Sequence, residues 1–219
     1  LPPTPYPLPP TPYPLPPVIK RFTERYQRVK LILRQGSPMQ ISALVTSGEA
    51  DIAIATEAFE QFPELILLPC YQWNRCVVVP SKHPLLKLKE LTLEAINQYP
   101  IITYDFAFTG RSKINQAFAS RGLEPNVILT AIDSDVIKTY VELGLGVGIL
   151  ANMAFDPKRD KNLRSIDASH LFEPSTTRIG ISRNTYLRGY IFDFIEMFAP
   201  HLNHANIQAR LDNSETDAV

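Results

Sequence analysis

Apolar residues recur along this chain at two spacings, one typical of amphipathic helices and one typical of buried strands. In the segment 16–27, Val18, Phe22 and Tyr26 share one helical face, and the charged residues between them fall on the opposite face. The segment 51–55 is a run of small residues of the kind that is buried on both faces of a sheet. Such patterns alternate along the chain, which predicts βαβ units with mainly parallel sheets. The expected helices are 16–27, 38–47, 91–98, 111–121, 134–143 and 186–200, and the expected strands are 29–35, 51–56, 65–80, 100–104, 125–131, 147–151 and 176–182.

Two long extended segments divide the chain into lobes. The segment 65–80 is the expected crossing from one lobe to the other, and 176–183 is the expected return. Two crossings predict a hinge and a cleft that a ligand closes. The predicted fold class is therefore α/β, with two Rossmann-like lobes joined by two crossover strands. Lobe I comprises residues 15–72 plus 174–219, and lobe II comprises residues 73–173.

A proline repeat precedes the first predicted helix. Of the twenty prolines in the chain, ten lie in residues 1–17, where Leu-Pro-Pro-Thr-Pro-Tyr-Pro occurs twice over residues 1–14. Such a tract is typical of an extended polyproline segment or a ligand for aromatic-lined grooves. We interpret it instead as an artefact or fusion remnant, because it ends abruptly against an ordinary amphipathic helix.

The segment Thr109-Gly110-Arg111-Ser112 lies between a strand and a helix and carries groups suited to an anion. The first N–H groups of a helix have no partner within it and lie at the positive end of its dipole. A hydroxyl, a glycine and a cation at that point favour a carboxylate or a sulfate. The alternative is that Thr109 or Ser112 merely caps the helix.

Two further residues extend this candidate anion site. Thr56 follows the buried strand 51–56, and ligands of open α/β sheets gather at the carboxyl ends of strands. We expect Thr56 and Thr109 to face one crevice from two different sheets. Ser37 is a third candidate, although Pro38 after it favours a simple helix cap.

The charge balance argues against direct binding of nucleic acid. The chain has 22 basic and 22 acidic residues, and no run of lysine and arginine alternates with aromatic residues. A chain of 219 residues that is 45% hydrophobic buries a full core, as one large domain or two small ones. No run of about twenty apolar residues and no leader is visible, so we expect a cytoplasmic protein without a membrane partner.

The sequence offers little support for metal, cofactor or catalytic chemistry. Cys70 and Cys76 flank Trp73 without CxxC spacing, and we expect two reduced, buried thiols, with a disulfide as the alternative. The four histidines are scattered, and no catalytic or phosphate-binding motif occurs. The glycines in 144–148 resemble a dinucleotide fingerprint, but they follow a helix, so a helix end leading into a strand explains them better. We therefore expect no enzyme, no cofactor and no metal.

Several segments resemble one family of regulators. The resemblance covers about residues 15–200 and rests on the G-x-x-D-x-A-I pattern at 48–54 and on segments 78–85 and 144–149. These are similar to the effector-binding domain of LysR-type transcriptional regulators. Within that family, segments 54–57, 68–75, 108–112 and 133–141 most resemble the CysB-type branch, the cysteine-regulon activators and their sulfonate-responsive relatives.

The resemblance implies a type 2 periplasmic-binding-protein-like fold and a role in sensing sulfur and cysteine metabolism. In that branch, the threonines matching Thr56 and Thr109 hold an anion or an acetylserine-type effector in the interdomain cleft. A tryptophan matching Trp73 lies near the effector. N-acetylserine, O-acetylserine, sulfate, thiosulfate and adenosine phosphosulfate all remain open as effectors.

The resemblance also implies partners. Helix 16–27 of one subunit is expected to lie antiparallel to helix 134–143 of another, with Lys20 and Lys138 exposed at the dimer interface. Full regulators of this type are usually tetramers. Their DNA-binding winged helix-turn-helix is expected to be absent from this chain, so DNA is a partner only through that missing part.

One segment departs from the family, and two other classes of protein remain in view. The family opens with a strand and a Thr-Thr-His-Thr-Gln segment that contacts the effector, and residues 7–10 of the proline repeat stand there instead. The alternative function is a solute-binding protein that delivers a small anion to a transporter. An enzyme ranks third, with Asp105, Glu57 and Arg111 as its only nearby acid and base candidates.

Overall fold

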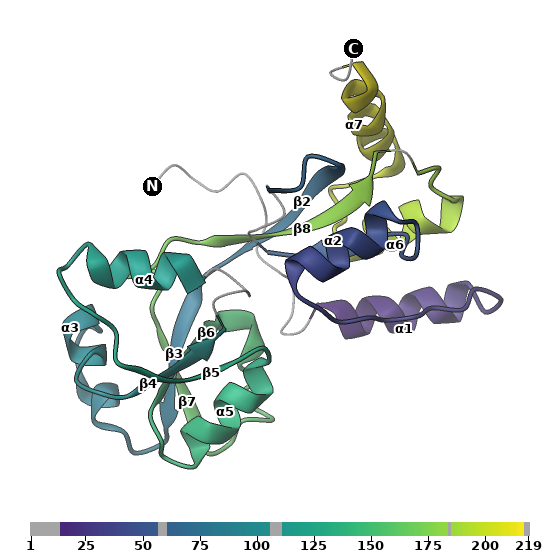
Figure 1. Cartoon of the computed structure of the whole chain (residues 1–219). Coiled ribbons are helices and arrows are strands. Elements are labelled where there is room, and N and C mark those ends of the chain that lie inside the picture. The colour runs from purple at the N-terminus through teal and green to yellow at the C-terminus, as the bar shows by residue number, and fades with distance from the viewer. Residues whose placement is uncertain (1–13, 57–60, 106–110, 184, 217–219) are drawn as a thin grey trace. The chain divides into compact units, whose positions relative to one another are not determined.

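The computed structural model describes residues 14–56, 61–105, 111–183 and 185–216, which form two compact units of mixed α/β structure. Unit 1 comprises Leu1–Gln72 and Thr176–Val219, and unit 2 comprises Trp73–Ser175 (Figure 1). The contacts divide the chain after residues 72 and 175, whereas the sequence pattern placed the divisions after residues 72 and 173. The helices are α1 (Leu15–Arg25), α2 (Pro38–Thr46), α3 (Leu93–Ile96), α4 (Arg111–Ala119), α5 (Ser134–Glu142), α6 (Gly189–Phe198) and α7 (His204–Thr216), with 3-10 turns η2 (Pro84–Lys87) and η3 (Asn152–Ala154). The strands are β1 (Ala53–Ala55), β2 (Leu65–Trp73), β3 (Arg75–Pro80), β4 (Ile101–Tyr104), β5 (Val127–Ala131), β6 (Val147–Ala151), β7 (Leu163–Asp167) and β8 (Ser175–Ser182).

Unit 1 is built on a three-stranded sheet in the order β1-β8-β2. Strand β1 runs antiparallel to β8, with Ala53 opposite Gly180. Helix α1 packs on α6 through its apolar stripe, and Val18 and Phe22 of this stripe are buried. The ring centroids of Phe22 and Phe194 lie 5.3 Å apart in an edge-to-face arrangement. The helical period read from the sequence therefore placed this inward face correctly.

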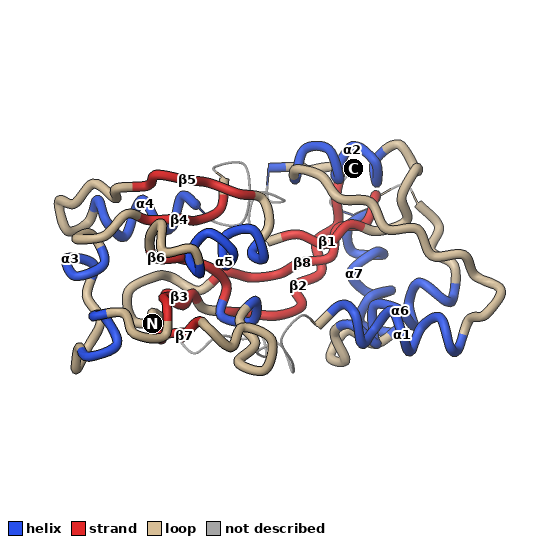
Figure 2. Tube along the Cα trace, turned by 90° about the horizontal axis from the view of Figure 1, so that it is seen from below, coloured by secondary structure: helices blue, strands red, loops and turns tan. Residues whose placement is uncertain are grey.

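Unit 2 is built on a five-stranded sheet in the order β5-β4-β6-β3-β7 (Figure 2). Strand β4 runs parallel to β5 and β6, whereas β3 runs antiparallel to β6 and β7. The expectation of mainly parallel sheets is therefore wrong. Helices α4 and α5 return the chain in its original direction, which makes parallel pairs.

Other local expectations also differ from the structure. The segment 29–35 is not a strand: Ile32 and Leu33 are 64% and 61% exposed, and only Val29 and Leu31 pack on the core of unit 1. The apolar residues of 29–35 suggest a strand by their spacing, but a strand also needs a neighbouring strand to form hydrogen bonds with its backbone. No described strand pairs with this segment. The expected strand 65–80 is divided at Asn74, and β7 and α7 were missed altogether.

The glycines of segment 144–148 lie where α5 ends and the chain leads into β6, as the sequence predicted. Gly144 has φ of +80° and donates its N–H to the carbonyl of Val141 at 2.9 Å, which closes α5. A Cβ on Gly146 would lie 2.4 Å from the carbonyl oxygen of Pro100. Gly144 therefore ends the helix, and Gly146 lets the chain pass close to the backbone of Pro100. Within the described ranges, no helix is long and apolar enough to cross a membrane.

Candidate functional site

The beginning of α4 holds an arginine against the carboxyl end of β4. Arg111 is the first residue of α4 and is half-buried. Its Nη1 donates to the carbonyl of Tyr104 at 3.1 Å, and its Nε donates to Oδ1 of Asn115 at 3.0 Å. Burial lowers the pKa of Arg111 and nearby Asp105 opposes this effect, but a guanidinium remains charged at neutral pH. A fixed, partly desolvated cation therefore stands at the positive end of α4.

The neighbours of Arg111 complete only part of the predicted anion site. Ser112 is exposed in the first turn of α4. Thr109 and Gly110 lie outside the described residues, so their assignment to the site stays a prediction. Arg111 and Ser112 are the members of this segment whose positions the structure gives.

Thr56 and Ser37 lie in unit 1 and differ in their surroundings. Thr56 directly follows β1 and is a buried polar residue, 8% exposed. Ser37 caps α2: its Oγ accepts from the N–H of Gln40 at 3.3 Å, and Gln40 Oε1 accepts from the N–H of Ser37 at 2.8 Å. This capping box confirms the simpler interpretation of Ser37, while its contact with an effector stays a prediction.

Trp73 is part of the core of unit 2. Its side chain is 1% exposed, and the guanidinium of Arg75 lies 5.2 Å from its ring centroid. Cys76, the next residue but two, belongs to the same apolar cluster. Packing and a cation–π contact therefore account for the ring, and its proximity to an effector stays a prediction.

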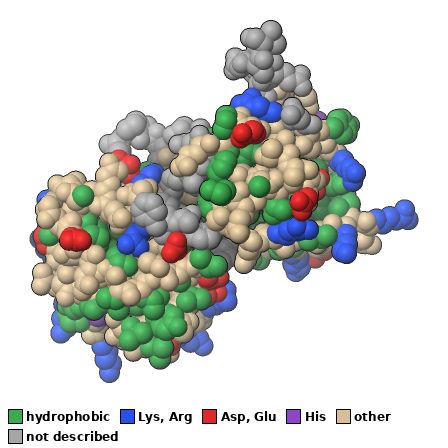
Figure 3. Space-filling view, viewed as in Figure 1, with side chains coloured by type: hydrophobic (Ala, Val, Ile, Leu, Met, Phe, Trp, Pro, Cys, Tyr) green, Lys and Arg blue, Asp and Glu red, His purple; other side chains and the backbone are tan. Residues whose placement is uncertain are grey.

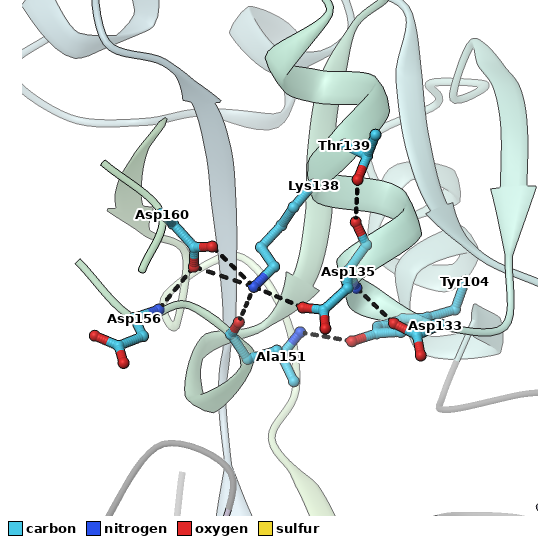
Figure 4. Close-up of polar contacts among 9 residues, drawn as sticks. Tyr104, Asp133, Asp135, Lys138, Thr139, Ala151, Asp156 and Asp160 are labelled. Carbon is cyan, nitrogen blue, oxygen red and sulfur yellow. Dashed lines mark hydrogen bonds and ion pairs between the residues drawn. The ribbon is translucent and has the colours of Figure 1, made fainter. Parts of the chain in front are cut away.

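Lys138 is buried, and the expectation that it is exposed at a dimer interface is wrong. Its side chain is 6% exposed, and its Nζ lies 2.9 Å from Asp135 Oδ1 and 3.1 Å from Asp160 Oδ1. The same Nζ donates to the carbonyl of Ala154 at 3.0 Å. Figure 4 shows the lysine between the carboxylates of Asp135 and Asp160. Oxygen atoms of three residues and a long apolar stem stabilise the lysine beneath the surface, which helical period alone does not predict.

Apolar residues at helical spacing lie instead at the surface of α5 and directly after it. Val136 and Leu143 are 43% and 69% exposed, and Tyr140 between them is half-buried. Three further exposed apolar residues lie on β5 or close to either end of α5; they are Ile128, Ile132 and Leu145. Figure 3 shows apolar side chains gathered around α5. The spacing of 136, 140 and 143 is the signal that identifies this face. Lys20, in contrast, is exposed as expected, with Glu24 at 4.0 Å.

The two cysteines are free and buried, as the sequence predicted. Cys70 lies in the core of unit 1 and Cys76 in the core of unit 2. Burial raises the pKa of each thiol to about 12. Among the described residues, no group of three or more His, Cys, Asp or Glu side chains is arranged to hold a metal ion.

The fold is that of the effector-binding domains of LysR-type regulators. The chain superposes on the crystal structure of the cofactor-binding domain of the Cbl transcriptional regulator with a TM-score of 0.86 at 42% identity, covering 91% of this chain and 87% of that one. The effector-binding domain of QuiR in complex with shikimate gives a TM-score of 0.74 at 18% identity, covering 86% of this chain and 90% of that one. Residues 7–203 match the LysR substrate binding domain, and the chain belongs to that family.

Curated relatives agree with this assignment. The chain is 56% identical over 194 residues to the HTH-type transcriptional regulator SsuR of Burkholderia cenocepacia, covering 89% of this chain and 63% of the relative. It is 52% identical over 193 residues to the regulator CysB of the same organism, covering 88% of this chain and 62% of the relative. The chain thus spans less than two thirds of the length of these relatives.

Proposed function

We propose that this chain is the effector-sensing part of a LysR-type transcription regulator of sulfur and cysteine metabolism. The observation that carries the proposal is the similarity to SsuR and CysB, at 56% and 52% identity, over nearly nine tenths of this chain. The regulator is favoured over a transporter's solute-binding protein, because these relatives are named as transcriptional regulators. We expect it to act in the cytoplasm, without catalysing a reaction.

The proposed effector is a small anion of the sulfate, thiosulfate or acetylserine type. Arg111 and the first turn of α4 supply positive charge, and Ser112 supplies a hydroxyl donor. Thr56 and Thr109 are proposed to donate further hydrogen bonds, with Gly110, Trp73 and Ser37 in supporting positions. An effector changes the protein only as far as it binds one arrangement of the two units more tightly than another.

We further propose that the chain forms a homodimer through α1 of one subunit and α5 of the other. Because Lys138 is buried, the contact proposed for α5 is apolar and does not use this lysine. Val136 on α5 and Leu143 directly after it supply an apolar contact, and Lys20 on α1 belongs to the polar rim. The complete regulator is proposed to be a tetramer that binds DNA through a part outside this chain.

Calorimetric titration tests the effector proposal. The parent chain is titrated with sulfate, thiosulfate, N-acetylserine and O-acetylserine, and then compared with Thr56→Ala and Thr109→Ala. Loss of one hydrogen bond to a charged ligand costs about 1.5–3 kcal/mol, a decrease of roughly ten- to a hundred-fold in affinity. Thr139→Ala is the matched control, because Thr139 is an exposed threonine on α5. Absence of binding by a folded parent contradicts the proposed effector class.

The dimer proposal has a separate test. Leu143→Asp places a charge at an exposed apolar position directly after α5 and is expected to dissociate the dimer in analytical ultracentrifugation. Glu142→Asp, at the neighbouring exposed position, is the control. A dimer of unchanged strength in Leu143→Asp contradicts the use of this face.

A further inference from the structure

Two cations hold the segment by which the chain leaves unit 2. Residues 173–175 end unit 2 and lead into β8. Arg75, the first residue of β3, is 1% exposed; its Nη1 donates to the carbonyl of Glu173 at 2.9 Å and its Nη2 to Oγ of Ser175 at 2.9 Å. The beginning of β3 and the exit segment are therefore joined directly by a buried guanidinium.

The second cation comes from α4. Lys113 is half-buried, and its Nζ donates to the carbonyl of Pro174 at 2.5 Å. Three successive residues of the exit segment thus each accept a hydrogen bond from a positively charged side chain. Hydrogen bonds with a charged donor are roughly twice as strong as neutral ones, so α4 and the exit segment are expected to move together.

Lys113 lies in the same first turn of α4 as Arg111 and Ser112, two residues of the proposed effector site. A displacement of this turn displaces Nζ of Lys113. Because Nζ is bonded to the carbonyl of Pro174, the displacement reaches the point where the chain passes to unit 1. Arg75 fixes the residues on both sides of Pro174, so they follow together.

We propose that Lys113 is a positioning residue that couples effector binding at α4 to the exit segment 173–175. This inference rests on the proposed function, because it concerns the consequence of effector binding at that site. Lys113 is not proposed to bind the effector; it transmits the movement of α4. By linkage, an exit segment held by Lys113 also favours the arrangement of α4 that binds the effector.

Hydrogen exchange with and without the effector tests the coupling. Calorimetry first identifies which of sulfate, thiosulfate, N-acetylserine and O-acetylserine the parent binds, and that compound is the probe. In the parent, the probe is expected to slow amide exchange in the peptide 171–178 by about five-fold or more. In Lys113→Met, which keeps the apolar stem and removes the charged donor, binding persists within about five-fold and the slowing is lost.

Two further variants separate coupling from general stability. Lys113→Arg restores a charged donor and is expected to restore the slowing. Lys82→Met removes an exposed lysine from the same unit and is expected to leave both binding and slowing unchanged. Undiminished slowing in Lys113→Met overturns the inference, as does a parent that binds the probe without any slowing. Absence of binding by the parent overturns the proposed function and this inference with it.

Discussion

Helices α1 and α5 are both amphipathic, and both carry a lysine that the sequence pattern predicts to be exposed, yet they use it in opposite ways. On α1, Lys20 is 78% exposed and lies 4.0 Å from Glu24. On α5, Lys138 is 6% exposed and joins the helix to Asp160 and to the carbonyl of Ala154. The helical period therefore finds which face is buried, but it does not tell whether a lysine at the edge of that face turns outward or inward.

The two helices also begin differently. The residue before α1 is Pro14, which offers no side-chain acceptor for the first N–H groups. Asp133 caps the beginning of α5, because its Oδ1 accepts from the N–H of Asp135 at 2.6 Å. Helix α5 thus has a side-chain cap at its beginning, which α1 lacks.

The largest expected effect is that of Lys138→Ala, with a loss of about 3–5 kcal/mol in the free energy of unfolding. The substitution leaves the carboxylate of Asp160, 13% exposed, without its cation. Urea denaturation followed by circular dichroism measures the loss. The double variant Lys138→Met/Asp160→Asn is expected to recover part of it, because no unpaired buried carboxylate remains. A loss below about 1 kcal/mol in Lys138→Ala shows that the cluster in Figure 4 contributes little.

The second effect concerns pH and is shared by both units. Burial raises the pKa of Cys70 and Cys76 from 9.0 to about 12. Above pH 9 the unfolded chain loses these thiol protons while the native chain keeps them, so this contribution to stability is complete below pH 9 and falls as pH rises. From pH 9 to 10 each thiol costs up to about 1.4 kcal/mol. Unfolding of the parent and of Cys70→Ala/Cys76→Ala from pH 8 to 10 measures the slope, and equal slopes contradict the prediction.

A smaller effect is expected at the beginning of α5. Asp133→Ala removes the acceptor for the N–H of Asp135 and is expected to cost about 1 kcal/mol. Asp133→Asn keeps a capping oxygen and serves as the control, with a loss of a few tenths of a kcal/mol. Thermal unfolding measures both. Equal losses in the two variants would mean that the charge of Asp133, and not its capping bond, stabilises α5.

The smallest effect is expected for Lys20→Ala, which changes the free energy of unfolding by less than about 0.5 kcal/mol. The lysine is exposed and its distance to Glu24 is at the outer limit of an ion pair. The measurement is the same denaturation as for Lys138→Ala, so the two lysines are compared directly. A loss comparable to that of Lys138→Ala would remove the contrast between the helices.

Several parts of the fold follow from sequence alone because they depend on neighbouring residues. The inward face of α1, the cap of α2 at Ser37 and the close of α5 at Gly144 are set by helical period, capping chemistry and a left-handed backbone. Segment 29–35 shows the limit of such reasoning. Its alternating residues predict a strand, but a strand depends on a distant neighbour, and none of the described strands provides one.

The candidate site divides in the same way. The sequence by itself indicated a cation and a hydroxyl at the beginning of α4 and a threonine at the end of β1. Neighbouring residues suffice for this, because the ends of strands and the beginnings of helices can be recognised from short stretches of sequence. Only the tertiary structure decided that Lys138 is buried among oxygen atoms, that Arg111 is fastened to Tyr104, and that Arg75 and Lys113 hold residues 173–175. These contacts join residues far apart in the chain or depend on how deeply a side chain is buried. Neither can be predicted from the local sequence pattern.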